Sequence, residues 1–262
     1  MKLRATPTAA GAIFLGLALT LTANAQVVLN AVGTPVVIDF TGFTAAGFQA
    51  TPTAGQLDSD AWSVFGFSDG DLAFGGTGTS GDYARGLLTA DSSTGGIYAA
   101  DAVAGRAFVI QPSSNDFTPG SITLRVLNNS GAILTQLGLS YDIVSRNNAS
   151  NSSSWNFTHS ADNSSFTNVA GLDFATPTTA DGFGWTPTPR GTTLTGLNIS
   201  PGAFYYLRWS SNDLGSGTRD ELGLDNIVIT PIPEPGTIGL LLLAGLAGAR
   251  TVQMNRRKKL QA

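Results

Sequence analysis

Two acidic side chains near the end of the chain come closest, by type and spacing, to a catalytic pair. Glu221 is the only glutamate between residues 26 and 232, and Asp225 follows it four positions later on the same side of an expected strand. Hydrolysis of a glycosidic bond uses two carboxyl groups that lie about 5 to 9.5 Å apart. Four residues along a strand cover about 13 Å. A hydrolase would therefore need a second carboxylate from another strand.

The one histidine, His159, would have to serve as the base of any Ser-His-Asp arrangement. It stands in "WNFTHSAD", between Thr158 and Ser160. The chain also has no cysteine, which excludes a cysteine nucleophile, disulfide bonds and thiolate metal ligands. We therefore predict an exposed or edge-strand histidine in a protein that is not an enzyme.

Oxygen ligands for a hard cation occur in three segments rich in aspartate. These residues are Asp58 and Asp60, Asp69 and Asp71, and the series Asp213, Asp220 and Asp225. None of the segments matches the twelve-residue EF-hand loop, and aspartate and glycine are common in turns for conformational reasons alone. The sequence thus predicts no cofactor and no metal site, and it leaves a structural calcium ion as an open alternative.

Exposed aromatic rings next to polar side chains would suit a sugar, because a pyranose presents C–H groups and hydroxyls together. Trp62 and Trp209 stand in alternating segments typical of core strands, and Trp155 stands in a third such segment. Trp185 lies in "DGFGWTPTPRG", which glycine and proline mark as a loop. We predict that Trp185 contacts a ligand, with packing over the end of a sheet as the alternative.

The charge of the central region excludes one class of partner. Residues 26–232 contain seventeen acidic residues against seven arginines and no lysine, a net formal charge of −10. Binding to a nucleic-acid backbone needs clustered lysine and arginine. We therefore expect no nucleic-acid partner.

Residues 26–232 are predicted to form a single all-β domain. Turn-forming residues interrupt this region every eight to fifteen positions, and around residues 121–127 apolar side chains alternate with polar ones, as in a strand with one wet face. About eleven strands without a helical stripe predict two packed antiparallel sheets, a β-sandwich that is jelly-roll-like. The expected strands are 35–40, 61–67, 95–100, 106–112, 121–129, 134–146, 153–161, 166–175, 192–200, 204–211 and 221–230.

The N-terminus has the three parts of a secretory signal peptide. It begins "MKLR", continues with an apolar stretch over residues 9–21, and ends with small residues at Ala23 and Ala25. This pattern predicts a signal helix over residues 1–25 that signal peptidase removes. A buried N-terminal helix of the domain is the alternative.

The C-terminus has the length and flanks of a membrane anchor. Residues 236–249 are apolar and would span about 21 Å as a helix, short of the ~30 Å hydrocarbon core, so the predicted span extends over about 236–255. A basic cluster follows, and it should stay on the cytoplasmic side. The cluster comprises Arg256, Arg257, Lys258 and Lys259.

Together these features resemble the PEP-CTERM sorting signal of bacterial exported proteins. The matching parts are Pro233, Glu234 and Pro235, the apolar span 238–249 and the basic residues 256–259. The resemblance implies recognition by an exosortase, a membrane enzyme that cleaves near the triplet. It also implies that the protein comes from a bacterium that makes extracellular polysaccharide. Arg250 followed by "TVQMN" departs from the usual pattern at the end of the span. An anchor that is never cleaved is the alternative for residues 233–262.

A second resemblance covers the last third of the body. The segment "YYLRWSSNDLGSGTRDELGLDNIVIT" is similar to the closing hairpin of extracellular jelly-roll domains that resemble carbohydrate-binding modules in fold. The protein is thus expected to be exported and non-enzymatic, and associated with the cell surface or with exopolysaccharide. A carbohydrate-binding module is the alternative function, and a glycan hydrolase is a more distant one. The precursor is expected in the inner membrane and the mature body at the cell surface or outside the cell.

Overall fold

The computed structural model describes residues 19–21, 26–102, 105–182, 184–211 and 219–232. These residues form β-strands and two short 3₁₀ helices, η1 (Gly81–Tyr83) and η2 (Ala170–Leu172), with no α-helix among them. No helix in this part of the chain is both long and apolar enough to cross a membrane. The prediction of an all-β domain is confirmed.

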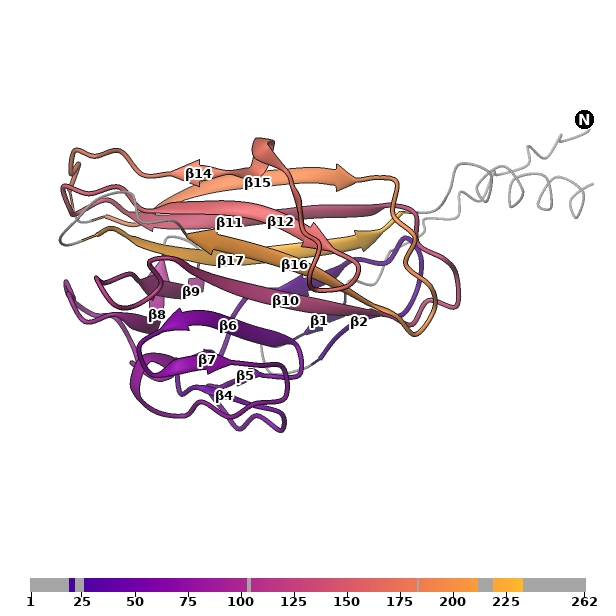
Figure 1. The fold of residues 1–262 in the computed structure, drawn as a ribbon, viewed down its shortest axis with the longest axis horizontal. Coiled ribbons are helices and arrows are strands. Elements are labelled where there is room, and N and C mark those ends of the chain that lie inside the picture. Colours follow the sequence, from indigo (N-terminus) through magenta and orange to yellow (C-terminus); the bar gives the residue numbers. More distant parts are fainter. Residues whose placement is uncertain (1–18, 22–25, 103–104, 183, 212–218, 233–262) are drawn as a thin grey trace, which may run out of the picture.

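Most strands belong to two sheets whose strands run along the long axis of Figure 1. The seven-stranded sheet contains β1 (Leu19–Leu21), β3 (Val36–Ile38), β8 (Gly96–Ala102), β9 (Gly105–Gln111), β11 (Leu137–Arg146), β15 (Thr186–Leu194) and β17 (Glu221–Pro231). The eight-stranded sheet contains β2 (Val27–Leu29), β6 (Trp62–Phe67), β7 (Gly70–Leu72), β10 (Gly120–Asn128), β12 (Ser154–Ser160), β13 (Thr167–Asn168), β14 (Phe174–Ala175) and β16 (Phe204–Ser211). A separate parallel pair joins β4 (Phe48–Gln49) to β5 (Leu57–Asp58).

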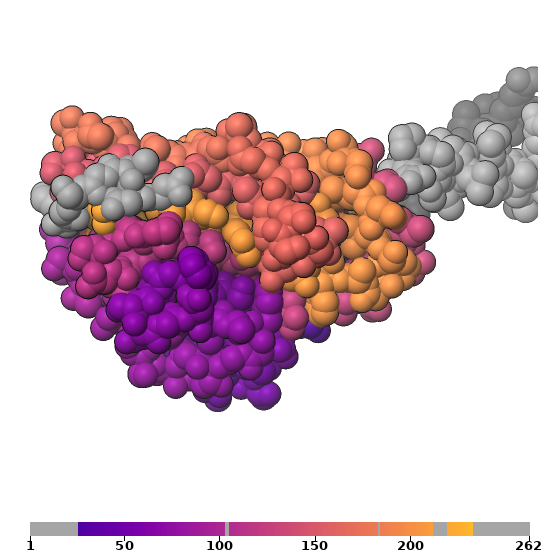
Figure 2. Space-filling model, viewed as in Figure 1, coloured from indigo at the N-terminus to yellow at the C-terminus, as the bar shows by residue number. Residues whose placement is uncertain are grey.

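The long strands alternate between the two sheets. From β9 to β17, the chain enters β10, β12 and β16 of the eight-stranded sheet in turn and returns each time to the seven-stranded sheet through β11, β15 and β17. The long strands pair in an antiparallel sense, and the parallel strand pairs among the described residues are β1 with β3, β2 with β10 and β4 with β5. Strands that alternate between two sheets in this way make a β-sandwich. Figure 2 shows the first half of the chain, indigo to magenta, gathered on one flank of the molecule.

The core lies between the sheets and is centred on tryptophan. In the register of β10 with β16, Ile122 faces Trp209 and Leu124 faces Leu207, and all four side chains are buried. Trp209 lies 5.3 Å from the ring centroid of Tyr141 in the opposite sheet, in an edge-on contact. Burial of these apolar side chains on alternate positions is what the period of two predicts.

Most of the predicted strands are present. The predicted strand 166–175 is instead two short strands, β13 and β14, separated by η2, and the predicted strand 192–200 overlaps β15 only at residues 192–194. The strands β2, β4, β5 and β7 were not predicted, because two or three residues carry little alternation. The segment before residue 192, expected as a loop, is the first half of β15. Pro187 and Pro189 stand in this strand opposite β11. The strand is the edge of its sheet among the described residues, which is where proline is tolerated because its missing N–H would face solvent.

The chain ends are described only in part. Leu19–Leu21 is extended and pairs in parallel with β3, so the signal helix predicted over residues 1–25 is wrong for these three residues. They pair with a strand edge, whose backbone groups satisfy theirs. The remainder of the predicted helix and the predicted membrane span over 236–255 lie outside the described residues.

Gly66 offers a test of the packing between β6 and the loop before β10. Its φ is +95°, and a Cβ added there would lie 2.3 Å from the carbonyl oxygen of Pro119. We expect Gly66→Ala to destabilise the protein by about 2 to 4 kcal/mol, through both the left-handed backbone and the overlap. Urea denaturation would measure the loss.

Gly42→Ala is the matched control for Gly66→Ala. The φ of Gly42 is +84°, but nothing lies within 4 Å of the added Cβ. This variant should lose only the backbone contribution of about 1 kcal/mol. Equal losses in the two variants would contradict the close contact at Gly66.

Candidate functional site

The outer face of the eight-stranded sheet carries the most distinctive set of polar and aromatic side chains. Alternate residues of its central strands point away from the core, and register brings them into rows. Thr123 of β10 lies opposite Arg208 of β16 on one side and Ser63 of β6 on the other. In the next row, Ser121 lies opposite Ser210 and Phe65. The outer face of the sheet therefore carries rows of serine and threonine, with Arg208 and Phe65 among them.

A cleft of about 250 Å³ opens on this face beside β6, β7, β10 and β16. We call it the Arg208 cleft, and the side chains that matter below are Phe65, Asp71, Phe74, Thr123, Asn163 and Arg208. The four strands lie side by side in Figure 1. Asp71 and Phe74 come from β7 and the residues after it, and Asn163 comes from the turn after β12.

Arg208 is held in a fixed position in this cleft. Its Nε donates to Oγ1 of Thr123 at 2.9 Å, and one Nη2 hydrogen is donated to Oδ1 of Asn163 at 3.3 Å. The guanidinium carbon stands 3.6 Å from the ring centroid of Phe166, a cation–π contact. Partial burial lowers the pKa of Arg208, although a guanidinium remains charged at any physiological pH.

A second arginine and its aromatic neighbours border the cleft. The guanidinium of Arg125 lies 4.6 Å from the ring centroid of Phe74 and 4.4 Å from that of Phe204. Its charge is balanced by Asp60, whose carboxylate is 3.6 Å away. The ring of Tyr206 lies 5.9 Å from that of Phe74. This packing fixes the ring that lines one side of the cleft.

Phe65 differs from the other aromatic rings near the cleft because it is exposed to solvent. Its side chain is 55 % exposed although it lies on a strand, and it lines the Arg208 cleft. A phenyl ring on a sheet is more commonly buried, and here it stands opposite Ser121, a residue too small to cover it. The ring offers an apolar surface next to polar groups.

His159 lies on β12 and has a tyrosine as its hydrogen-bond partner. It lies at the edge of a second cleft of about 400 Å³, and its Nδ1 is 2.5 Å from the hydroxyl of Tyr205. Burial lowers the pKa of His159, so the imidazole is neutral at pH 7. The described structure gives it no serine hydroxyl as a hydrogen-bond partner. The expectation of an exposed or edge-strand histidine is wrong, because β12 pairs at this residue with both β13 and β16 and the side chain is half-buried.

Glu221 and Asp225 both lie in β17, and the strand keeps them apart as expected. Glu221 is fully buried opposite Arg146, and neither of its carboxyl oxygens has a hydrogen-bond partner among the described residues. Burial raises its pKa to about 7. Asp225 is buried opposite Asp142, and burial raises its pKa to about 6. Neither residue lines either cleft, so the geometry assembles no hydrolase pair from them.

The aspartates considered for calcium are engaged with the protein itself. Asp58 accepts from the backbone of Asp60 at 2.7 Å, and Asp60 pairs with Arg125. Asp220 accepts from the N–H of Ala149 at 2.9 Å. Across the described residues, no three acidic or imidazole side chains converge as a metal site. Asp213 lies outside the described residues.

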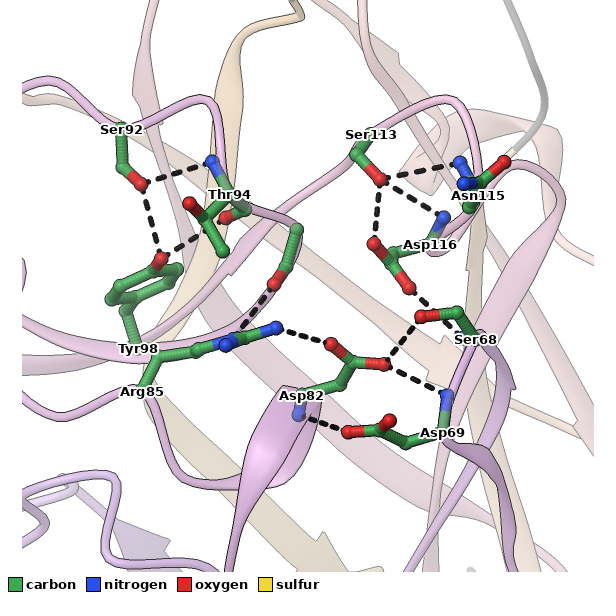
Figure 3. Close-up of polar contacts among 11 residues, drawn as sticks. Ser68, Asp69, Asp82, Arg85, Ser92, Thr94, Tyr98, Ser113, Asn115 and Asp116 are labelled. Carbon is green, nitrogen blue, oxygen red and sulfur yellow. Dashed lines mark hydrogen bonds and ion pairs between the residues drawn. The ribbon is translucent and has the colours of Figure 1, made fainter.

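Asp69 belongs to a network that ties the β6–β7 turn to η1 and to the loop before β10, drawn in Figure 3. Asp82 accepts from the hydroxyl of Ser68 and from the N–H of Asp69, and it pairs with Arg85 at 2.6 Å. Asp116 accepts from the N–H of Ser68 at 2.9 Å. These carboxylates are occupied by donors of the chain, so they act as turn braces.

Trp62 and Trp209 are core residues as predicted, and Trp185 lies on a different face from the cleft. Trp62, Trp155 and Trp209 are buried in the core. Trp185 stands just before β15, half-buried, and packs against the outer cluster that includes Tyr98 and Val144 on the seven-stranded sheet. This is the packing arrangement given above as the alternative to ligand contact.

The residues predicted for processing lie outside the described structure. They are Ala23 and Ala25 at the signal cleavage site, Pro233, Glu234 and Pro235 of the sorting motif, and the basic residues Arg256, Arg257, Lys258 and Lys259. They remain predictions from the sequence.

No protein-family profile and no curated protein sequence matches the chain. Among solved structures, the chain is similar to the CBM22-1 xylan-binding domain from Paenibacillus barcinonensis, at 8% identity over 79% of this chain and 99% of that one, with a TM-score of 0.39. It is also similar to the CBM22-1–GH10 modules of a Clostridium thermocellum xylanase complexed with xylohexaose, at 8% identity over 66% of this chain, with a TM-score of 0.34. The chain spans 26% of that xylanase structure.

A third similar structure is the K3 cleaved adhesin domain of Lys-gingipain from Porphyromonas gingivalis, at 14% identity over 49% of this chain and 78% of that one, with a TM-score of 0.33. None of these three likenesses reaches a TM-score of 0.4. The function is therefore inferred from the side chains alone.

The sequence did not reveal the cleft, although one signal was present. Arg125 and Arg208 each occupy an outward position between core residues of an alternating strand. Two strands that each carry an arginine on the solvent-facing side, between buried residues, indicate a functional face more directly than a tryptophan in a loop does. The partners Phe65 and Asn163 could not be found without the register.

Glu221 gives a test through the pH dependence of stability. Its pKa is raised from 4.5 to about 7 in the folded protein, so the folded state holds a proton that the unfolded state has lost between these pH values. Stability therefore falls as the pH rises from about 4.5 to about 7, by roughly 3 kcal/mol for this residue. We expect Glu221→Gln to remove this fall, measured as Tm against pH.

A smaller fall should remain in Glu221→Gln because the pKa of Asp225 is also raised by burial, to about 6. The slope with pH is the readout, since any cost of burying the glutamine amide does not depend on pH. A variant that kept the whole decline in Tm between pH 5 and 8 would show that Glu221 ionises freely in the folded state.

Proposed function

We propose that the exported body binds carbohydrate through the Arg208 cleft and the outward-facing side chains around it. The carrying observation is an aromatic ring open to solvent at the rim of a polar cleft: Phe65 is 55 % exposed and lines the same cleft as Arg208 and Asp71. A sugar ring needs both kinds of contact at once, an apolar face for its C–H groups and hydrogen-bond groups for its hydroxyls.

The polar groups of the cleft are placed to serve hydroxyl groups of a ligand. Arg208 supplies donors, and the carboxylate of Asp71 supplies an acceptor. Ser63 of β6 lines the same cleft and is partly exposed, so its hydroxyl adds a further polar group. Because these side chains stand on strands, the sheet fixes their spacing before any ligand arrives, which lowers the entropic cost of binding.

The shape of the site suits a segment of polymer. Its volume of about 250 Å³ is below the range of about 300 to 1,000 Å³ that encloses a drug-sized molecule. The cleft also opens on the outer face of the sheet, so a sugar chain bound there need not be enclosed. We infer a non-enzymatic protein that holds polysaccharide.

The sequence of the chain ends supports the place where this occurs. A signal peptide over residues 1–25 and a PEP-CTERM-like segment over residues 233–262 would lead to export and to handling by signal peptidase and an exosortase-like enzyme. In this proposal the mature body meets extracellular polysaccharide at or beyond the cell surface. Its net charge of −10 keeps it soluble there.

Phe65→Ala tests the proposal at its carrying residue. The wild-type protein should be retarded in affinity electrophoresis by at least one of a panel of neutral and acidic polysaccharides, including xylan, galactan and alginate. We expect Phe65→Ala to weaken that binding about fivefold to tenfold, because contact with a ring face is worth on the order of 1 kcal/mol. The exposed ring contributes little to folding, so Tm should change by only a few degrees.

Ile133→Ala is the matched control, because Ile133 is also 55 % exposed and does not line the Arg208 cleft. It should bind as the wild type does. Trp185→Ala examines the alternative site predicted from the sequence, and we expect it to retain binding. A wild-type protein that no polysaccharide retards, or a loss confined to Trp185→Ala, would count against the cleft.

A further inference from the structure

Arg208 differs from most arginines of the described structure in having no carboxylate within ion-pair distance. Arg85, Arg106, Arg125 and Arg146 each pair with an aspartate. Arg208 instead contacts two neutral oxygens and a ring. Its positive charge therefore has no acidic partner among the described residues, although the body as a whole is strongly acidic.

Three N–H groups of the Arg208 guanidinium have no hydrogen-bond partner among the described residues. An arginine has five N–H groups, and Arg208 uses one at Nε and one at Nη2. Neither hydrogen of Nη1 has a partner among the described residues, and this nitrogen belongs to a side chain that lines the cleft. Three N–H groups are more than the two parallel bonds that a carboxylate accepts from arginine.

The position of this charge is fixed before a ligand binds. Phe166 holds one face of the guanidinium plane, and Thr123 and Asn163 hold its edge. Partial burial of an arginine costs free energy, and the contacts that offset it here are two neutral oxygens and a ring, so the charge itself stays without an anion. A planar, preorganised and uncompensated cation is the arrangement that binds a planar anion.

We propose that the Arg208 cleft prefers sugars that carry a carboxylate, the uronic acids, and that Arg208 binds this group. The proposal rests on carbohydrate binding at the same cleft and names the class of sugar. The ring of Phe65 packs on the apolar face of the pyranose while the carboxylate pairs with the guanidinium.

The negative charge of Asp71 weakens the preference of the cleft for acidic sugars. Its carboxylate lines the same cleft, and one of its oxygens accepts from the N–H of Gly66 at 3.0 Å. A uronate would be repelled by Asp71 while it is attracted by Arg208, and the acidic body would repel a polyanion at longer range. Any preference for acidic sugars must therefore arise at Arg208, which makes that residue a sharp test.

The experiment compares each polymer with its own neutral form. The probes are alginate, polygalacturonate and hyaluronate, each next to the same polymer with its carboxyl groups methyl-esterified, with the full chain in affinity electrophoresis or biolayer interferometry. We expect the acid form of at least one polymer to bind about tenfold or more tightly than its ester. The esters keep the ring and hydroxyl contacts, so they isolate the charge.

Variants of the cleft assign the preference to its residues. Arg208→Gln should bind acid and ester alike, and Arg208→Lys should lose most of the preference because an ammonium cannot make two parallel bonds. Asp71→Asn, at an exposed site, should bind the acid form more tightly than the wild type does. Arg190→Gln is the control, because Arg190 also lacks an acidic partner among the described residues and its ring contact is with Phe174.

The outcomes separate this inference from the proposed function. Equal binding of acid and ester by the wild type, or an unchanged preference in Arg208→Gln, would overturn the uronate assignment and leave carbohydrate binding intact. An equal preference for a sulfated polymer such as dextran sulfate over dextran would overturn the assignment to carboxylate. Failure of every polymer, esterified or neutral, would remove the proposed function itself. Should Arg208→Gln fold poorly by circular dichroism, Arg208→Lys and Asp71→Asn still decide the matter.

Discussion

The antiparallel register between β10 and β16 determines both the core of this protein and its candidate site. Ile122 opposite Trp209 and Leu124 opposite Leu207 lock the inward side chains of the two strands. Because side chains alternate, the same register sets Thr123 against Arg208 on the other face. A slip by one residue would put an arginine between the sheets and a tryptophan in water. The energy that holds the core therefore also holds the donor geometry of the cleft.

The polar network of Figure 3 extends this control to the far side of the cleft. Ser68 and Asp69 form the turn between β6 and β7, and their backbone N–H groups are bound by Asp116 and Asp82. The chain that leaves this turn carries Asp71 and then Phe74 into the cleft. Asp69, a cation-ligand candidate from the sequence, accepts from the N–H of Asp82 in the same network, so a donor of the protein takes the place of a metal ion.

The sequence predicted what depends on a single strand and missed what depends on two. Alternation located the long strands and placed Trp62 and Trp209 in the core, since the period of two is visible within six or seven residues. In the cleft, Thr123 contacts Arg208, which lies 85 positions away in the sequence. Phe65 lines the same cleft and is distant in the sequence from both. Proline in 186–189 indicated a loop because the sequence does not show which strand lies at an edge. Register and edge position are properties of the assembled sheet.

The prolines of β15 affect how readily copies of this protein associate with one another at high concentration. An unprotected edge strand invites a second copy to add its own strand, and repeated addition would join the domains into a fibre. In β15, Pro187 and Pro189 interrupt the donors along the outer side of the edge. A protein concentrated beside a polymer would then be less prone to join its copies through this edge of the sheet.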